Sequence, residues 1–263
     1  MISGLCSFKY KFVSLQGLVD ARGTRGAAIC CASNVCCALV EVWAGVQAAL
    51  HSPTLLYNSM ETFFLSHAYL VEHCNAPVRR SLMDTIDWSY RMIGIRGPRG
   101  VGRTSFLLQY AKENYDVRLR QCLYINVNSF YFQARGIVDF AGRFVAGGGQ
   151  VLLIDQAFKL TDWREQLCEC YHKYPYLRIV YTTTSVNQGD DDDPTELSSI
   201  SRMYVLHGFS FREYISLQTN EPFEAYTFDE LMNDHSRILR SILPRVHPWH
   251  YFQEYLQHGY YPF

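Results

Sequence analysis

The sequence predicts a three-layer α/β fold in which helices cover a mainly parallel sheet of five strands. Two observations predict this fold. From Met60 onward, short apolar runs alternate with segments of helical periodicity, which is the pattern of strand–helix–strand units. One of these runs, VLLID at 151–155, is continuously apolar and ends in a carboxylate, as expected for a central strand covered on both faces. A ligand is therefore expected at the carboxyl ends of the strands.

The composition fits one large domain. Of the 263 residues, 48% are hydrophobic and 19% are charged, which excludes intrinsic disorder for most of the chain. The formal net charge is −1, so no overall field attracts nucleic acid or an anionic membrane. The 9 cysteines lie at irregular spacings in a chain with ample core-forming residues, which indicates reduced thiols. We therefore expect a cytoplasmic protein.

The first 55 residues differ in composition from the rest. The stretch 27–50 is apolar, but Glu41 lies inside it, at a cost of roughly 2.5 to 3.5 kcal/mol for membrane insertion. We expect residues 1–55 to form a poorly structured or loosely helical extension, with a membrane segment at 27–50 as the alternative. Residues 56–263 are then expected to form the folded domain.

Helical and strand patterns follow one another in a regular order. Periodicity predicts helices over 61–74 and 78–89, and the apolar run 92–95 predicts the first strand. Three glycines at 147–149 stop the helix before the third strand. The other elements are expected as follows: helices over 104–115, 136–146, 163–174, 210–218, 227–242 and 248–257, and strands over 121–127, 151–155, 177–184 and 202–207.

The residues GPRGVGRT at 97–104 match the phosphate-binding pattern G-x-x-x-x-G-K-[ST], except that Arg103 replaces lysine. In this arrangement, backbone N–H groups and the amino terminus of the following helix converge on a phosphate. Arg103 would supply the cation for the β and γ phosphates, and Thr104 would offer a hydroxyl to Mg²⁺. The predicted nucleotide-binding residues are Gly97, Pro98, Arg99, Gly100, Val101, Gly102, Arg103, Thr104 and Ser105.

A carboxylate ends the strand 151–155. Asp155 is costly at the end of a buried strand unless a cation or hydrogen bonds compensate it. Mg²⁺, bound directly or through water, would satisfy the charge. We therefore predict a metal site formed by Thr104 and Asp155.

With these motifs in place, residues 60–263 resemble a bacterial family of AAA-type P-loop ATPases, in which a carboxy-terminal domain of unknown function follows the ATPase domain. The resemblance rests on four stretches: RRSLMDTIDWSYRMIGIRGPRGVGRTS, VLLIDQAFKLTDWREQL, YPYLRIVYTTTS and GFSFREYISL. It implies a P-loop NTPase fold of the AAA (ASCE) type, with the P-loop strand flanked by later strands. It also implies ATP and Mg²⁺ as cofactors, held by residues including Gly97, Gly102, Arg103, Thr104 and Asp155.

The sequence departs from the family at two catalytic positions. Besides Arg103, Gln156 occupies the place of the Walker B glutamate that activates the attacking water, and an amide cannot accept a proton near neutral pH. Thr184, at the polar end 182–184 of a strand, falls where the family places a sensor of the γ phosphate, although threonine is also simply a good strand residue. Gln156 and Thr184 are the predicted catalytic positions.

Two further departures from the family concern the arginines before the fifth strand and the length of the chain. The arginines that family members carry just before the fifth strand are not matched at Ser199 and Ile200, and the chain ends at Phe263, where the family continues. We therefore expect an ATPase domain truncated at its carboxy-terminal end. It is expected to bind ATP, with weak or absent hydrolysis. One alternative is an active ATP hydrolase coupled to an unknown remodelling task. The other is a non-catalytic interaction module, or a truncated relic, without nucleotide. A homo-oligomer or a protein partner stays open.

Overall fold

The computed structural model describes residues 60–184 and 196–261, which belong to one compact unit, Ser52–Phe263. The expected extension at 1–55, and with it the alternative of a membrane segment at 27–50, lies outside the described residues. Within the described ranges, no helix has both the length and the apolar character needed to cross a membrane.

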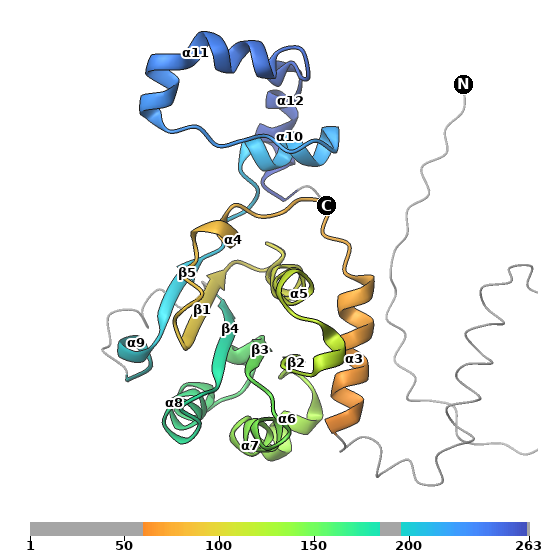
Figure 1. Cartoon of the computed structure of the whole chain (residues 1–263), viewed down its shortest axis with the longest axis vertical. Coiled ribbons are helices and arrows are strands. Elements are labelled where there is room, and N and C mark those ends of the chain that lie inside the picture. The colour runs from red at the N-terminus through yellow and green to blue at the C-terminus, as the bar shows by residue number, and fades with distance from the viewer. Residues whose placement is uncertain (1–59, 185–195, 262–263) are drawn as a thin grey trace, which may run out of the picture. The chain divides into compact units, whose positions relative to one another are not determined.

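A sheet of five parallel strands forms the centre of the domain (Figure 1). Its order is β2-β3-β4-β1-β5, so β1 lies between β4 and β5, two strands that come later in the chain. The predicted three-layer α/β fold is confirmed. The strands are β1 (Met92–Gly97), β2 (Cys122–Asn126), β3 (Val151–Asp155), β4 (Arg178–Thr184) and β5 (Arg202–Val205).

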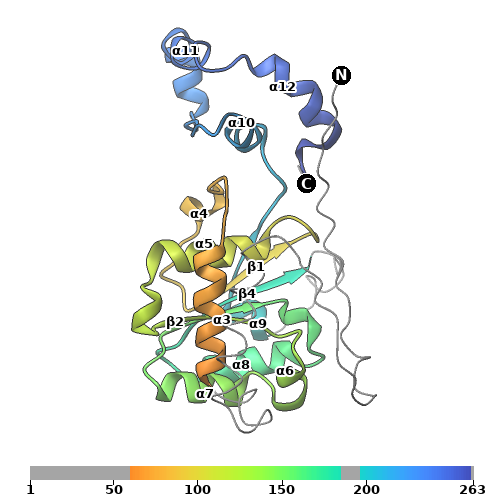
Figure 2. The ribbon, with the colours of Figure 1, turned by 90° about the vertical axis from the view of Figure 1, so that its right-hand side faces the viewer.

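Helices cover both faces of the sheet. Helix α5 packs on one face, α6, α7 and α8 pack on the other, and α3 lies beside β2 and α5 (Figures 1 and 2). The helices are α3 (Met60–His73), α4 (Leu82–Thr85), α5 (Arg103–Asn114), α6 (Phe130–Arg135), α7 (Val138–Ala146), α8 (Trp163–Lys173), α9 (Glu196–Ile200), α10 (Phe211–Thr219), α11 (Phe228–Ile242) and α12 (Pro248–Glu254). Short 3₁₀ turns span Val117–Leu119 and Ala157–Lys159, and a π-helical turn spans Tyr255–Gly259.

Strand β3 shows why this sequence forms a layered core. All five of its residues are buried. Leu152 and Ile154 pack into the cluster that contains α6 to α8, whereas Val151 and Leu153 pack into the cluster that contains α5. Successive side chains of a strand point to opposite faces, so a continuous apolar run requires cover on both. This places the carboxylate of Asp155 at the end of a strand that is buried on both sides.

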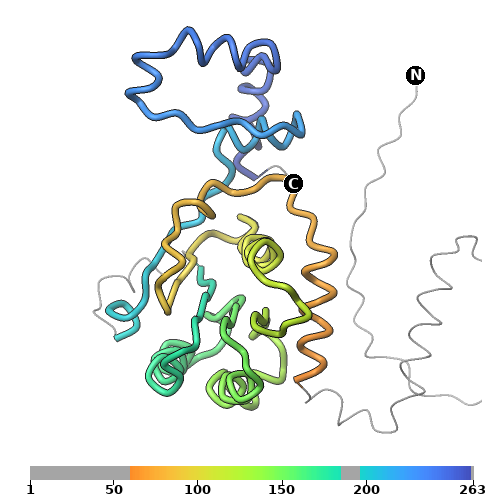
Figure 3. Tube along the Cα trace, in the orientation of Figure 1, coloured from red at the N-terminus to blue at the C-terminus, as the bar shows by residue number. Residues whose placement is uncertain are grey.

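The helix predicted over 78–89 is wrong, because only α4 forms there (Figure 3). Before α4, Arg80 and Ser81 turn their side chains to Glu213 instead of continuing a helix. After α4, the backbone becomes extended, and the carboxylate of Asp87 accepts the N–H of Ser89 at 3.0 Å. Such a local side-chain bond to the backbone competes with helix formation.

The helix predicted over 136–146 is confirmed as α7, which begins at Val138 and ends at Ala146. A second helix, α6, lies directly before it and was not predicted. Gly136 separates them with a φ of 73°, and this backbone conformation favours glycine. The side chain of Gln166 accepts the N–H of Ile137 at 2.5 Å, which satisfies a donor at the start of α7.

A buried histidine in α3 makes the stability depend on pH. His67 is 1% exposed, and its Nδ1 accepts the N–H of Tyr124 at 3.1 Å. Burial lowers the pKa of His67 from 6.5 to about 4. The unfolded chain therefore gains a proton as the pH falls below 6.5, whereas the folded protein stays neutral until about 4. The contribution of the neutral ring to stability is fully present above pH 6.5, the pKa in the unfolded chain. It is lost as the pH falls from 6.5 to about 4.

We expect the free energy of unfolding to fall by roughly 3 kcal/mol across that window, at about 1.4 kcal/mol per unit of pKa difference. Urea unfolding at the two ends of the window measures this change. His67→Gln keeps an acceptor for the Tyr124 N–H but cannot be protonated. An equally steep pH dependence in this variant would assign the effect to other groups.

Candidate functional site

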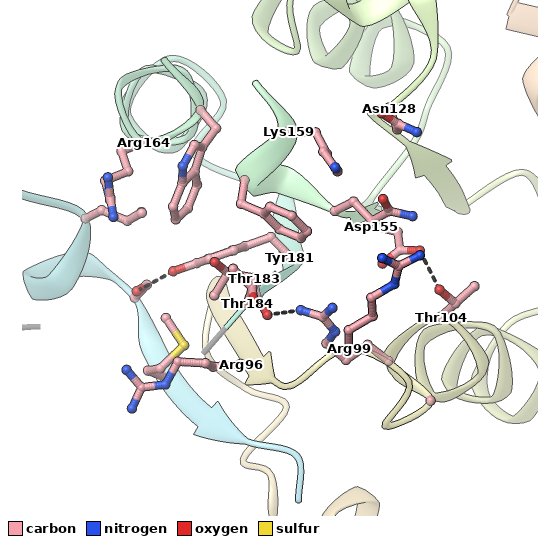
Figure 4. Close-up of a pocket in the computed structure, with 18 of the residues that line it drawn as sticks. Arg96, Arg99, Thr104, Asn128, Asp155, Lys159, Arg164, Tyr181, Thr183 and Thr184 are labelled. Atoms are coloured by element: carbon pink, nitrogen blue, oxygen red, sulfur yellow. Dashed lines mark hydrogen bonds between the residues drawn. The ribbon is translucent and has the colours of Figure 1, made fainter. Parts of the chain in front are cut away.

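A cavity of about 1050 Å³ lies at the carboxyl ends of the strands (Figure 4). The loop after β1, the start of α5, the ends of β3 and β4, and parts of α8 and α9 line it. Among the described lining residues, five are cationic and one, Asp155, is anionic. A cleft lined by one sign of charge concentrates ligands of the opposite sign, although the whole chain is nearly neutral. The cationic residues are Arg96, Arg99, Arg103, Lys159 and Arg164.

The loop between β1 and α5 has the backbone that its glycines predict. Gly100 and Gly102 adopt φ values of 86° and 91°, in the left-handed region, and Gly102 caps the amino terminus of α5. A side chain at Gly97 would place its Cβ 2.6 Å from the carbonyl oxygen of Leu206, so there is no room for one. The loop therefore turns tightly and delivers the helix amino terminus to the cavity.

Six of the nine predicted nucleotide-binding residues line the cavity. They are Arg99, Gly100, Gly102, Arg103, Thr104 and Ser105. Gly97, Pro98 and Val101 are not among the lining residues, and the side chain of Val101 packs in the core beneath the loop. Their contribution is to the path of the loop, since Gly97 ends β1 and Val101 anchors the turn.

Asp155 accepts hydrogen bonds from three hydroxyl groups. Its Oδ2 accepts from Thr104 Oγ1 at 2.6 Å and from Tyr124 Oη at 2.9 Å, and its Oδ1 accepts from Thr182 Oγ1 at 2.6 Å. The carboxylate is 1% exposed, so these donors offset a large desolvation cost. The structure therefore brings the predicted metal ligands Thr104 and Asp155 into direct contact (Figure 4).

Tyr124 and Thr182 belong to the site through their hydrogen bonds to Asp155. Tyr124 was not predicted, and Thr182 was predicted only as part of the polar strand end 182–184. Strands β2 and β3 pair with Asn126 opposite Asp155, which brings the end of β2 close to the carboxylate. Burial and the charge of Asp155 raise the pKa of Tyr124, so its phenol keeps the donated proton. The register between neighbouring strands could have indicated that these hydroxyls lie near Asp155. Register is known only once the sheet is assembled, so the sequence alone does not supply it.

Arg103 lies between the loop and the end of β4. Its Nη1 donates to the carbonyl oxygen of Thr183, and its guanidinium carbon lies 5.7 Å from the ring centre of Phe158. Burial lowers the pKa of Arg103, and the charge of Asp155 acts in the opposite direction. The hydrogen bond to Thr183 shows that the guanidinium reaches across the cavity toward the end of β4.

Gln156 and Thr184 both line the cavity that Thr104 and Asp155 also line. The N–H of Gln156 donates to Thr182 Oγ1 at 2.9 Å, and the same hydroxyl donates to Asp155. Gln156 has a φ of 59°, an uncommon value for a residue other than glycine. This bend directs the chain away from β3 immediately after the carboxylate.

Several other polar residues of the cavity were not predicted. Among them, Arg96, Asn128, Lys159 and Arg164 come from separate parts of the chain, and no sequence spacing connects them. Only the folded sheet brings them to the same cavity.

Residues 89–215 match the family model of a AAA domain. No curated protein matches the chain significantly. Among solved structures, PCH-2 of C. elegans is similar over 59% of this chain and 45% of its own, with 13% identity and a TM-score of 0.35. The S. cerevisiae Hsp104:casein complex in its extended conformation is similar over 70% of this chain and 38% of its own, with 13% identity and a TM-score of 0.41.

Domain III of the Thermotoga maritima replication initiation protein DnaA is similar over 59% of this chain and 65% of its own, with 15% identity and a TM-score of 0.36. The chain thus spans less than two thirds of each of these structures.

Proposed function

We propose, starting from the AAA-domain match over residues 89–215, that the chain binds ATP with Mg²⁺ in this cavity and hydrolyses it weakly or not at all. One observation carries the proposal. Thr104, at the amino terminus of α5, lies in hydrogen-bond contact with Asp155, at the end of β3, and both open into a cavity lined by five cations. Phosphate and a divalent cation together match this distribution of charge.

The loop and α5 would hold the phosphates. Gly100 and Gly102 let the backbone approach an anion closely, and the amino terminus of α5 adds partial positive charge. Arg103 would leave the carbonyl of Thr183 for the β and γ phosphates, exchanging a neutral acceptor for a charged one. Because Arg103 already points into the cavity, this exchange needs only a side-chain movement.

Thr104 and Asp155 fit Mg²⁺, which prefers oxygen ligands in proteins. The carboxylate is buried and ordered by Tyr124 and Thr182, so it needs no rearrangement to face the metal. Bound Mg²⁺ would neutralise charge on the β and γ phosphate oxygens. The chain's own residues position the metal through the hydroxyl of Thr104 and the carboxylate of Asp155.

Hydrolysis is expected to be limited by Gln156. Its amide could orient a water by hydrogen bonding, as could the hydroxyl of Thr184, but neither group accepts a proton near neutral pH. Calorimetric titration of the full chain with ATP, with and without Mg²⁺, tests the proposal. Mg²⁺-dependent binding of ATP is expected, and the absence of ATP affinity would contradict the proposal.

An active ATP hydrolase is the second candidate. Gln156→Glu introduces a general base next to Asp155 and is expected to raise steady-state phosphate release about 100-fold, within the range of about 10²–10⁴ for such catalysis. Adding Arg103→Lys tests whether the bulkier guanidinium also limits turnover. Wild-type release that already equals that of the Glu variant would favour this second candidate.

An interaction module that binds no nucleotide is the third candidate. The same titration separates it from the first two. The predicted homo-oligomer or protein partner remains a prediction.

A further inference from the structure

A single buried arginine connects the phosphate-binding loop to the carboxy-terminal helices. Arg80 is 8% exposed. Its Nη1 donates to the carbonyl oxygen of Val101 at 3.0 Å, within the loop itself. Its Nη2 donates to the carbonyl oxygens of His207 at 2.5 Å and Gly208 at 3.0 Å, between β5 and α10. Its Nε donates to Glu213 Oε1, on α10, at 3.3 Å.

Glu213 holds the other end of this connection. It is 5% exposed and closes the capping box of α10 with Ser210. The N–H and hydroxyl of Ser81 donate to its Oε1 at 2.8 and 3.1 Å. Burial acts to raise the pKa of Glu213, but the hydrogen bonds from Ser81 and Ser210 and the charge of Arg80 together lower it below its ordinary value. The carboxylate therefore stays ionised and fully hydrogen-bonded.

The contact with Val101 fixes the direction of one peptide group in the loop. The described residues contain no cis peptide bond, so the carbonyl of Val101 and the N–H of Gly102 point in opposite directions. The carbonyl points to Arg80, and Gly102 lines the cavity. By holding this carbonyl, Arg80 restrains the Gly102 N–H on the opposite side of the same peptide group, and this N–H would donate to a phosphate at the helix amino terminus.

We infer that Arg80 couples phosphate binding at the loop to the docking of α10, acting as a positioning residue that does not touch the ligand. The inference rests on the proposed binding of ATP. ATP that bonds to the Gly102 N–H favours the arrangement in which Val101 is bonded to Arg80, and Arg80 is in turn bonded to Glu213. By reciprocity, docking of α10 favours ATP.

The purely structural alternative makes a different prediction. If Arg80 only stabilises the fold, its replacement lowers the free energy of unfolding, but ATP affinity and the response of α10 to ATP stay the same. Arg80→Lys separates the two roles, because an ammonium group keeps the charge but cannot contact three chain segments as the planar guanidinium does. The neighbouring Arg79 provides a matched control, since its half-exposed side chain pairs with Asp84 and Glu113 and not with the loop.

Hydrogen exchange of the α10 amides in the full chain, with and without Mg²⁺ and ATP, is the decisive measurement. In the wild type, saturating ATP is expected to slow exchange over residues 211–219. Arg80→Lys is expected to remove this response and to weaken ATP binding about tenfold, a typical size for coupling between two sites. Arg79→Lys is expected to keep both. Glu213→Gln, which retains the shape of the side chain, is expected to behave like Arg80→Lys.

The outcomes distinguish the coupling from the proposed function. A wild type that binds ATP without any change of exchange in α10 overturns the coupling alone, whatever the variants do. The coupling is also overturned if Arg80→Lys binds ATP and responds like the wild type. A wild type without ATP affinity overturns the proposed function first, and the coupling with it.

Discussion

Arg103→Ala is expected to weaken ATP binding about 10- to 100-fold, since a hydrogen bond to a charged group is worth about 1.5–3 kcal/mol. Arg103 is the lining cation at the first position of α5, and its guanidinium already reaches across the cavity. The free energy of unfolding is expected to stay the same or to rise. The lowered pKa of Arg103 shows that its partly buried site disfavours the cation, so truncation relieves this cost.

Titration calorimetry and urea unfolding of the same preparation measure both effects of Arg103→Ala. Arg118→Ala, at an exposed arginine outside the cavity, is the control for the loss of one positive charge. Wild-type ATP affinity in the Arg103 variant would remove this residue from the proposed phosphate site. A similar loss of affinity in the Arg118 variant would point to a general effect of charge.

Glu213→Ala is expected to lower the free energy of unfolding by about 3–5 kcal/mol, the usual cost of removing one partner from a buried ion pair. The truncation leaves the guanidinium of Arg80 buried without its counter-charge. It also removes the capping box of α10 and the acceptor of Ser81. Urea unfolding measures the change.

The pair formed by Glu221 and Arg245 is a matched control for Glu213→Ala. Its shortest N–O distance is 2.8 Å, and both side chains are more than 40% exposed. Exposed ion pairs contribute about 0–1 kcal/mol, so Glu221→Ala is expected to leave stability almost unchanged. Equal effects of the two substitutions would show that burial of the Arg80–Glu213 pair does not set its contribution.

Strands β1 to β4 could be predicted because each contains an apolar run that the sheet buries, whereas the residues of β5 are exposed or half-buried. β3, whose five residues are all buried, occupies the predicted range 151–155 unchanged. The helix predicted over 78–89 failed because the bonds that replace it are long-range. Arg80 and Ser81 bind Glu213, more than 130 positions later, and periodicity within a short window carries no information about that partner.

The candidate site also contains some features that the local sequence could predict and others that it could not. The loop could be predicted from its glycines, because left-handed backbone and close approach restrict the residue type locally. The hydrogen bonds of Tyr124 and Thr182 to Asp155 could not be predicted, because the two hydroxyls come from two other strands and each residue is also an ordinary strand residue. The functional roles of Gln156 and Thr184 stay predictions.

The strand order has a consequence for how the protein forms on the ribosome. β1 pairs with β4 beginning at Ile179 and with β5 beginning at Arg202, and these pairs are its two neighbours in the sheet. β2 and β3 pair with each other and can associate earlier in synthesis. The emerging chain must therefore carry an unpaired apolar β1 until much of the domain has been translated. Such delayed, non-local pairing slows folding and exposes unpaired strand edges that are prone to aggregate. We therefore expect nascent chains to depend on chaperones.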